Sequence, residues 1–546
     1  MNAMSIFSLL GGLGLFLFGI KTMGDGLEQA AGPKMKRLLE ALTKNKILAV
    51  LVGALITGVI QSSSATTVMV VGFVNAGLLP LSKAIGVIMG ANIGTTVTSL
   101  MLSFQLNYAV IFTAVGALCQ LAGNRSSFKL LGQIMMGLGV LFLGMDTMTA
   151  AMVPLRDLPA FRDMMIMAQN PLVGVLVGTV VTALLQSSAA SVGILQALAA
   201  SGAVSLQASL FILFGQNIGT CVTALLAAVG ANRTGKRAAV VHLLFNVIGT
   251  ILFVALAMLL PLADWIQAIA GDNLRLQIAV SHILFNVATT LLLLPASGLL
   301  EKLARLIVRG EDEPSEPMRL QYFDARLLST PPVAVQQLFR EVQRMADIVM
   351  TNYRFAMQYY FAPKNLPLEE FTNREDVIDY LNAEITQHLI DVRGLTLSQH
   401  DVYLVGSLFH VVNDLERIGD HATNIVEIGQ SRKKDKIKFS SKAEHEIEEL
   451  SGLVTEMLEK SVRIVDRQIT DPEVISEVEV LESQVDAMSE ALADHHVDRV
   501  KAKKCTPRNG MLYLDMLNNL ERIADHADNL ASSVDNGAHE ETRFLW

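Results

Sequence analysis

The chain has 546 residues, 51% hydrophobic content and a formal net charge of −9 at pH 7. An acidic chain of this kind lacks the basic surface that binds nucleic acid, so we set that class of partner aside. Its three cysteines, Cys119, Cys221 and Cys505, are far apart and indicate neither a disulfide framework nor a thiolate metal site.

The composition changes near residue 310. From Met1 to about Leu300 apolar stretches follow one another, several near the roughly 20 residues that cross a bilayer. After about Glu311 charges are dense and no such stretch recurs. We expect a membrane region over 1–300, a linker over 301–330 and a soluble helical region over 331–546. The opening Met1–Ile20 lacks a basic start and a cleavage site, so it predicts a membrane helix rather than a signal peptide.

The membrane region contains an internal duplication. At one offset, LGLFLFGIKTM from Leu13 aligns with LGVLFLGMDTM from Leu138, LVGALITGVIQSSSAT from Leu51 with LVGTVVTALLQSSAAS from Leu176, and GANIGTT from Gly90 with GQNIGTC from Gly215. Three blocks in one register, with polar residues aligned, exceed what chance similarity between apolar segments produces. We expect repeat one over about 5–125, repeat two over about 130–260 and an extra helix over about 277–298.

Each repeat is expected to hold a helix, a re-entrant hairpin and two further helices. In repeat one these lie near 5–20, 47–60 with 65–79, 84–104 and 108–123. Arms of about 14 residues are too short to span a bilayer and are tolerated where protein covers them. Three crossings per repeat insert the second copy upside down, with its hairpin near 171–203. The predicted fold is therefore an all-α polytopic membrane protein with inverted repeats and two re-entrant hairpins.

Basic residues predict the orientation, because cytoplasmic loops carry an excess of Lys and Arg. The loop after the first helix contains Lys21, Lys34, Lys36, Arg37, Lys44 and Lys46. The loops expected outside contain only Arg156, Arg162 and Arg275. This distribution predicts seven crossings of the cell inner membrane, with the N-terminus outside and the C-terminal region cytoplasmic. Hairpin one would then enter from the cytoplasm and hairpin two from outside.

Polar side chains at membrane depth mark the candidate site. At each hairpin tip a new helix begins, whose N-terminus favours an anion, while exposed carbonyls and a Gln oxygen can accept a cation. An isolated Ser more often serves helix packing, but a duplicated QSS at two breaks favours binding. The runs containing Asn92 and Asn217 form a second polar pair, for which a backbone kink beside glycine is the alternative. The predicted substrate and sodium residues are Gln61, Ser62, Ser63, Ser64, Thr66, Asn92, Thr95, Gln186, Ser187, Ser188, Ser191, Asn217 and Thr220.

His242 and His282 lie in related runs, HLLFNV and HILFNV, and favour helix packing over a proton relay. The paired QSS motifs, the N-I-G-T runs and the duplication resemble the type II sodium-phosphate cotransporter family, in its bacterial form, across about 5–300. That resemblance implies phosphate movement coupled to sodium, with both QSS regions in the binding site. Ala189 departs from the pattern where the first copy has Ser64, which removes one hydroxyl from the second tip.

The soluble region is also duplicated. NDLERIGDHATN from Asn413 aligns with NNLERIADHADN from Asn518, and a helical apolar period predicts two three-helix bundles near 332–430 and 440–535. Carboxylates four residues apart share a helix face, where they repel one another unless a cation compensates. Oxygen ligands suit hard metals such as Mg, Mn or oxidised Fe. The alternative is a solvated face tempered by Arg417 and Arg522. The candidate ligands are Glu375, Asp379, Glu416, Asp420, Glu482, Asp486, Glu521 and Asp525.

These segments are similar to the PhoU family over about 332–535, which implies metal binding by the repeated E-x-x-x-D motifs, with Zn as a further candidate, and a regulator fused to a transporter. We expect a sodium-coupled phosphate carrier. A phosphate efflux valve or phosphate-sensing regulator is the alternative, because gradients set the direction of a reversible carrier. No nucleophile motif or Gly-rich phosphate loop favours an enzyme. The expected partners are inorganic phosphate, sodium and the lipid bilayer, with a homo-oligomer left open.

Overall fold

The computed structural model describes residues 3–41, 45–104, 108–122, 126–310, 318–362, 366–467, 469 and 471–543. All regular elements in these residues are helices, which confirms the all-α prediction. They form two compact units, one of Met1–Glu313 with Asp324–Val333 and the other of Pro314–Phe323 with Ala334–Trp546. Lys44, residues 311–317 of the expected linker, and the side chains of Lys34, Lys36, Arg37 and Arg156 lie outside what the structure describes.

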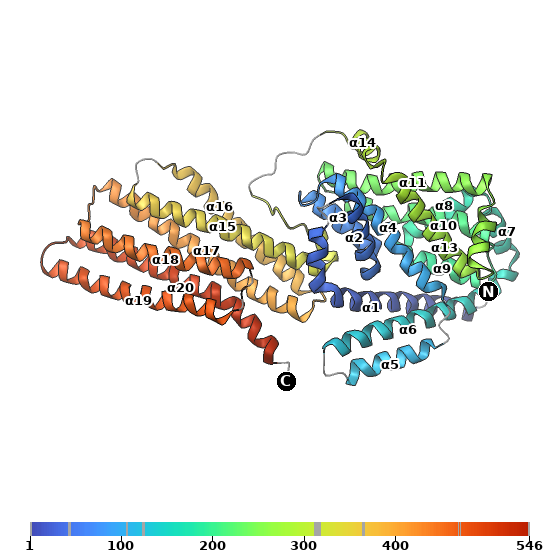
Figure 1. The fold of residues 1–546 in the computed structure, drawn as a ribbon, viewed down its shortest axis with the longest axis horizontal. Helices are drawn as coiled ribbons and strands as arrows, with labels where there is room; N and C mark the ends of the chain where they lie inside the picture. Colours follow the sequence, from blue (N-terminus) through green and yellow to red (C-terminus); the bar gives the residue numbers. More distant parts are fainter. Residues whose placement is uncertain are drawn as a thin grey trace. The chain divides into compact units, whose positions relative to one another are not determined.

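The first unit contains the blue to green helices of Figure 1. In chain order they are α1 (Ala3–Ala41), α2 (Lys46–Ile60), α3 (Ser63–Asn75), α4 (Leu81–Ser103), α5 (Ala109–Ala122), α6 (Ser126–Met152), η1 (Val153–Asp157), α7 (Pro159–Met167), α8 (Pro171–Leu185), α9 (Ser188–Ala200), α10 (Leu206–Ala227), α11 (Arg233–Leu259), α12 (Leu262–Ala270), α13 (Leu274–Leu293), α14 (Ser297–Ile307) and η2 (Ala325–Ser329). The first helix is longer than expected, because it continues past Ile20 to Ala41.

Six described helices are long and apolar enough to cross a membrane: α1, α4, α6, α10, α11 and α13. Helix α5, which we expected as another crossing, has 14 residues and falls short of the roughly 20 that a bilayer requires. The chain is thus a multi-pass membrane protein by the length and composition of its helices. The seven-crossing topology and the side on which each end lies stay predictions.

The inversion of the repeats is visible in α1 and α6, which occupy equivalent places in the two copies and lie side by side in Figure 1. Gly12 of α1 lies against Met148 of α6, whereas Gly19, further along α1, lies against Leu141. Contacts that run forward on one helix and backward on the other belong to an antiparallel pair. Equivalent helices of the two repeats therefore run in opposite directions, as the sequence predicted.

Each hairpin is held by a glycine contact between its first arm and the helix that follows the hairpin. A Cβ at Gly90 of α4 would lie 2.0 Å from the carbonyl oxygen of Val50 in α2. A Cβ at Gly215 of α10 would lie 2.0 Å from the carbonyl oxygen of Val175 in α8. Two backbones can approach this closely only where a side chain is missing, so both glycines position the tips of the hairpins.

The two hairpins open toward opposite ends of α13. At the start of hairpin one, Lys46 Nζ donates to Ser297 Oγ at 2.9 Å, just beyond the C-terminal end of α13. In hairpin two, Gln196 Nε2 of α9 donates to the carbonyl of Arg275 at 3.2 Å, at the N-terminal end of α13. Hairpin one therefore enters the membrane unit from the end at which the chain leaves α13.

The second unit consists of long helices arranged as two sets of three, drawn yellow to red in Figure 1. They are α15 (Pro331–Phe361), whose first residues belong to the first unit, α16 (Leu368–Arg393), α17 (Gln399–Lys434), α18 (Ser441–Arg467), α19 (Pro472–Lys501) and α20 (Pro507–Arg543). Helices α17 and α20 pack together through equivalent residues. His421 Nδ1 lies 2.9 Å from Asn519 Oδ1, and His526 Nδ1 lies 2.9 Å from Asp414 Oδ1.

We predict that Gly90→Ala destabilises the protein, because its Cβ would collide with backbone that cannot move aside. Overpacking of this kind costs about 1–3 kcal/mol. The matched control is Gly11→Ala in α1, where a Cβ would meet nothing within 4 Å. Thermal unfolding in detergent should show a clear fall in apparent Tm for Gly90→Ala and none for Gly11→Ala. Equal apparent Tm values would contradict the proposed contact.

Candidate functional site

Both hairpins break at their QSS motifs in the same way. Gln61 and Gln186 end the first arms in the left-handed backbone region, with φ values of 59° and 51°. This conformation is uncommon for residues other than glycine and turns the chain sharply. Ser62 and Ser187 then cap the second arms, their hydroxyls accepting from the backbone amides of Ala65 and Ala190. The predicted helix breaks are thus real, and each exposes the N-terminus of a new helix.

The two tips lie against each other. Ser63 Oγ, at the start of α3, is 3.4 Å from Ser188 Oγ, at the start of α9. The side chain of Ser63 is buried. Two helix N-termini from opposite repeats therefore converge on one place, as we expected from the duplication.

A second layer of hydroxyls supports each tip. Thr57 of α2 donates to Thr66 of α3 at 2.9 Å, and Thr182 of α8 lies 2.7 Å from Ser191 of α9. All four side chains are buried. Thr57 and Thr182 were absent from the predicted set. The signal for them was present, since the two threonines align in the duplicated block.

The tips differ where the repeats differ. Thr223 of α10 donates to Ser64 of the opposite repeat at 3.3 Å. The equivalent of Thr223 is Thr98, but Ala189 has no hydroxyl to receive it, and Thr98 donates instead to Gln61 Oε1 at 2.7 Å. The missing hydroxyl therefore changes the partner of Thr98 and fixes the amide of Gln61. The side chain of Gln186 is exposed.

Asn92 and Asn217 are buried within the continuous helices α4 and α10. Each amide group donates to the carbonyl four residues earlier, and each Oδ1 faces a histidine. His242 Nε2 lies 3.4 Å from Asn92 Oδ1, and His282 Nε2 lies 3.3 Å from Asn217 Oδ1. The two histidines thus tie α11 to α4 and α13 to α10, which agrees with a packing role. Thr95 and Thr220 donate to carbonyls of their own helices.

In the second unit the carboxylates of the second copy converge. Ligand oxygens of Glu482, Asp486 and Asp525 lie within 4.8 Å of one another, a spacing that one cation can bridge. Burial raises the pKa of Glu482, and Asp486 adds to the rise. Glu521, also predicted as a ligand, is turned toward Ser489, whose Oγ lies 3.4 Å from its carboxylate. The group has the chemistry of a hard-metal site.

In the first copy the four predicted carboxylates act on one another electrostatically. Burial raises the pKa of Glu375 to about 7, and the charges of Asp379 and Asp420 contribute to the rise. Burial likewise raises the pKa of Glu416, with Asp420 and Asp379 adding to it. Glu375 also accepts a hydrogen bond from Asn352 Nδ2 at 3.1 Å, and this bond lowers the pKa of Glu375. Concentrated negative charge of this kind is relieved by a proton or a bound cation.

The membrane unit matches a family model described as Na+/Pi-cotransporter over residues 15–150 and 160–271. The "Uncharacterized protein YqeW" of Bacillus subtilis is 32% identical over 294 residues, which cover 54% of this chain and 95% of that protein. The chain belongs to the Na+/Pi-cotransporter family. A PhoU domain model also matches twice, over residues 342–429 and 447–534. The resemblances seen in the sequence are thereby confirmed.

Other relatives bear more specific names. The "Putative inorganic phosphate export protein YjbB" of Salmonella typhimurium is 26% identical over 346 residues, 63% of this chain and 63% of that protein. The rat "Sodium-dependent phosphate transport protein 2A" is 36% identical over 99 residues, 18% of this chain and 16% of that protein. The two names differ in what they say about direction and sodium.

The raised pKa of Glu375 predicts a pH dependence. The folded protein holds this proton more tightly than the unfolded chain, so the associated stability is present below about pH 4.5 and is lost as the pH rises past 7. Glu375→Gln should therefore reduce the fall in Tm between pH 6 and pH 8, measured with a chelator present. Glu490→Gln, which changes an exposed carboxylate, should keep the wild-type fall. An unchanged pH dependence in Glu375→Gln would refute this assignment.

Proposed function

We propose that this protein couples the movement of inorganic phosphate to sodium, and that both bind where the two hairpin tips meet. The contact between Ser63 and Ser188 is the observation that carries the proposal, because it joins the N-termini of two half-helices from inverted repeats. Broken helices that meet near the midplane form the substrate sites of many secondary transporters. The family and the names of the relatives support phosphate as the substrate.

Phosphate would be held by the helix ends. Backbone N–H groups at the first turns of α3 and α9 lack partners within their own helices, and the helix dipoles place positive potential at the same point. The hydroxyls of Ser63, Ser64 and Ser188 add hydrogen-bond donors. No step requires an arginine, since co-bound cations would balance the charge of the anion.

Sodium would be held by oxygens beside the same tips. The first arms α2 and α8 end there, so their last carbonyls point toward the breaks. The Thr57–Thr66 and Thr182–Ser191 pairs place four more oxygens behind them. Hard monovalent cations prefer oxygen ligands of this kind. Gln61 Oε1, which already accepts from Thr98, is a further ligand in this proposal.

We place the N-terminus outside and the PhoU-like unit in the cytoplasm, on the distribution of basic residues. The second candidate is phosphate export, favoured by the name of the Salmonella relative. Import and export use one binding site in a reversible carrier, so the two candidates differ in the gradient that drives the protein, not in the residues that bind.

Uptake of radiolabelled phosphate into proteoliposomes tests the coupling. An inward sodium gradient should drive uptake, and Ser63→Ala with Ser188→Ala should lower it at least tenfold, because both helix N-termini lose a donor. Gln267→Ala in α12, which is far along the chain and exposed, is the control. Uptake that does not depend on sodium would contradict the proposed coupling. Efflux of phosphate from loaded vesicles would test the export candidate.

We further propose that the PhoU-like unit binds divalent metal at Glu482, Asp486 and Asp525, and at the equivalent cluster of the first copy. Addition of Mn²⁺ should raise the Tm of the protein at pH 8, because a cation relieves the repulsion between the carboxylates. Asp525→Asn should weaken the shift, whereas Glu490→Gln should not. A shift of equal size in both variants would place the metal elsewhere.

A further inference from the structure

A short segment that precedes α15 is bound to the membrane unit. We call it the strap, Asp324–Ser329, and it comprises η2 with the Asp324 that caps it. Leu327 is fully buried, and a Cβ at Gly72 of α3 would lie 3.1 Å from its Cδ2 atom. The side chain of Asp324 is 8% exposed. A linker that only joined two domains would not bury its residues in one of them.

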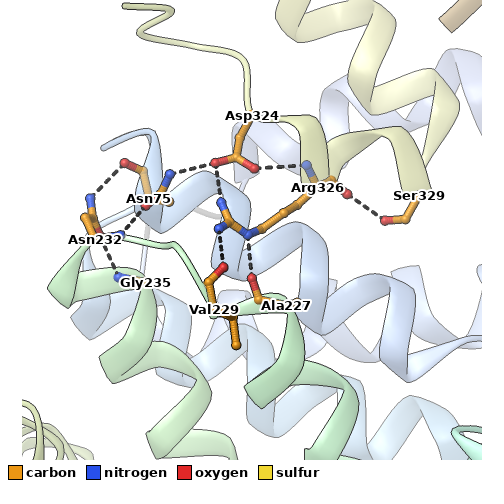
Figure 2. Close-up of polar contacts among 8 residues, drawn as sticks. All are labelled: Asn75, Ala227, Val229, Asn232, Gly235, Asp324, Arg326 and Ser329. Carbon is orange, nitrogen blue, oxygen red and sulfur yellow. Dashed lines mark hydrogen bonds and ion pairs between the residues drawn. The ribbon is translucent and has the colours of Figure 1, made fainter. Parts of the chain in front are cut away.

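The polar contacts of the strap join two helices that carry site residues, as Figure 2 shows. Asn75, at the end of α3, donates from Nδ2 to Asp324 at 2.6 Å. Arg326 donates to the carbonyls of Ala227 at 2.5 Å and Val229 at 3.1 Å, which lie at the C-terminal end of α10. Arg326 also pairs with Asp324 at 2.7 Å. A cation at a helix C-terminus satisfies free carbonyls and complements the dipole.

Both helices of this pair reach the candidate site, α3 at its N-terminal end and α10 one turn before the carbonyl of Ala227. Helix α3 begins at Ser63, and α10 carries Thr223, which donates to Ser64. Asn75 also accepts from the backbone amide of Asn232, at the start of α11, at 2.7 Å. The strap therefore joins the end of α3 that lies away from its tip to the C-terminal end of α10, where Thr223 contacts Ser64.

The inverted repeat shows what the strap replaces. The equivalent helices are α9 and α4, and there a side chain of the hairpin itself makes the bridge. Gln196 Nε2 of α9 donates to the carbonyl of Ser99 in α4 at 3.0 Å. The residue equivalent to Gln196 in α3 is Val71, which has no polar group. One end of the transporter closes with its own residues, and the other is joined by a segment contributed from beyond the membrane helices.

The strap is next to residues that belong to the PhoU-like unit. Phe323, one position earlier, is buried, and its backbone amide donates to the buried carboxylate of Glu341 in α15 at 3.2 Å. Its ring lies 4.6 Å from that of His388 in α16. The chain is thus fastened to one unit through Phe323 and to the other from Asp324 onward.

We infer that the surface formed by the ends of α3 and α10 is a docking site for the strap, and that its occupation keeps this end of the phosphate path closed. Release of the strap would free α3 to move away from α10, so the PhoU-like unit could control transport through the six residues that lead into it. This inference depends on the proposed function, because it assigns the regulation of the same site.

A reversible cross-link tests the inference. Gly72→Cys combined with Leu327→Cys should form a disulfide on oxidation, since a Cβ at position 72 would lie 3.5 Å from the Cγ atom of Leu327, which a cysteine sulfur would replace. Sodium-driven phosphate uptake should then fall at least tenfold and recover with reductant, while each single variant is insensitive to oxidation. A disulfide that leaves uptake unchanged overturns the inference, and so does failure of the pair to cross-link.

Removal of the positive charge of Arg326 from the strap should have the opposite effect on phosphate uptake. Arg326→Ala should raise uptake at least twofold over Arg305→Ala, a matched change in an exposed ion pair with Glu301. Labelling of Leu327→Cys by a maleimide should also be faster in Arg326→Ala than in Arg305→Ala. Absence of sodium-driven uptake by the unmodified protein would contradict the proposed function. The maleimide labelling of Leu327→Cys would still report whether the strap is docked on α3 and α10. Equal labelling rates would overturn the docking itself.

Discussion

A half-helix that ends inside a membrane leaves backbone groups that only protein can satisfy, and the architecture of the first unit follows from that constraint. Each hairpin is too short to span, so its tip must be covered on all sides. Close contacts at Gly90 and Gly215 hold the first arms against α4 and α10, and each serine cap satisfies one backbone amide in the first turn of a second arm. The hydroxyls of Ser63 and Ser188, at the starts of the second arms, face each other.

Duplication then determines what the covered space can bind. Inversion directs two helix N-termini at one point, so positive potential from both repeats acts on the same ligand. Duplication also supplies each supporting contact twice, as with the hydroxyls of Thr57 and Thr182 and the histidines on α11 and α13. The two repeats differ at a few positions, and these positions make the two ends of the membrane unit different. Ala189 alters one tip, and Gln196 has no polar counterpart in α3.

The candidate site of the second unit consists of charged carboxylates rather than helix N-termini. Carboxylates placed on one helix face repel one another, and partial burial raises the pKa values of Glu375, Glu416 and Glu482. Such a face is unfavourable by itself, and the proposed cation would stabilise it. The strap directly precedes the unit that carries the proposed metal site, so it is the segment through which a change in that unit's ligands would reach α3 and α10.

The sequence alone determined the division near residue 310, both duplications, the two helix breaks and most residues of the candidate site. These features are local, or they repeat at a constant offset, so the order of residues contains them. It did not predict that α1 continues to Ala41 or that α5 is short, because helix ends depend on weak preferences. Only the tertiary structure brought Ser63 to Ser188, His242 to Asn92 and Arg326 to the end of α10. Those partners lie 99 to 150 residues apart, and no periodicity relates a strap in a linker to the helix end that it caps. Packing of the whole unit decides such contacts.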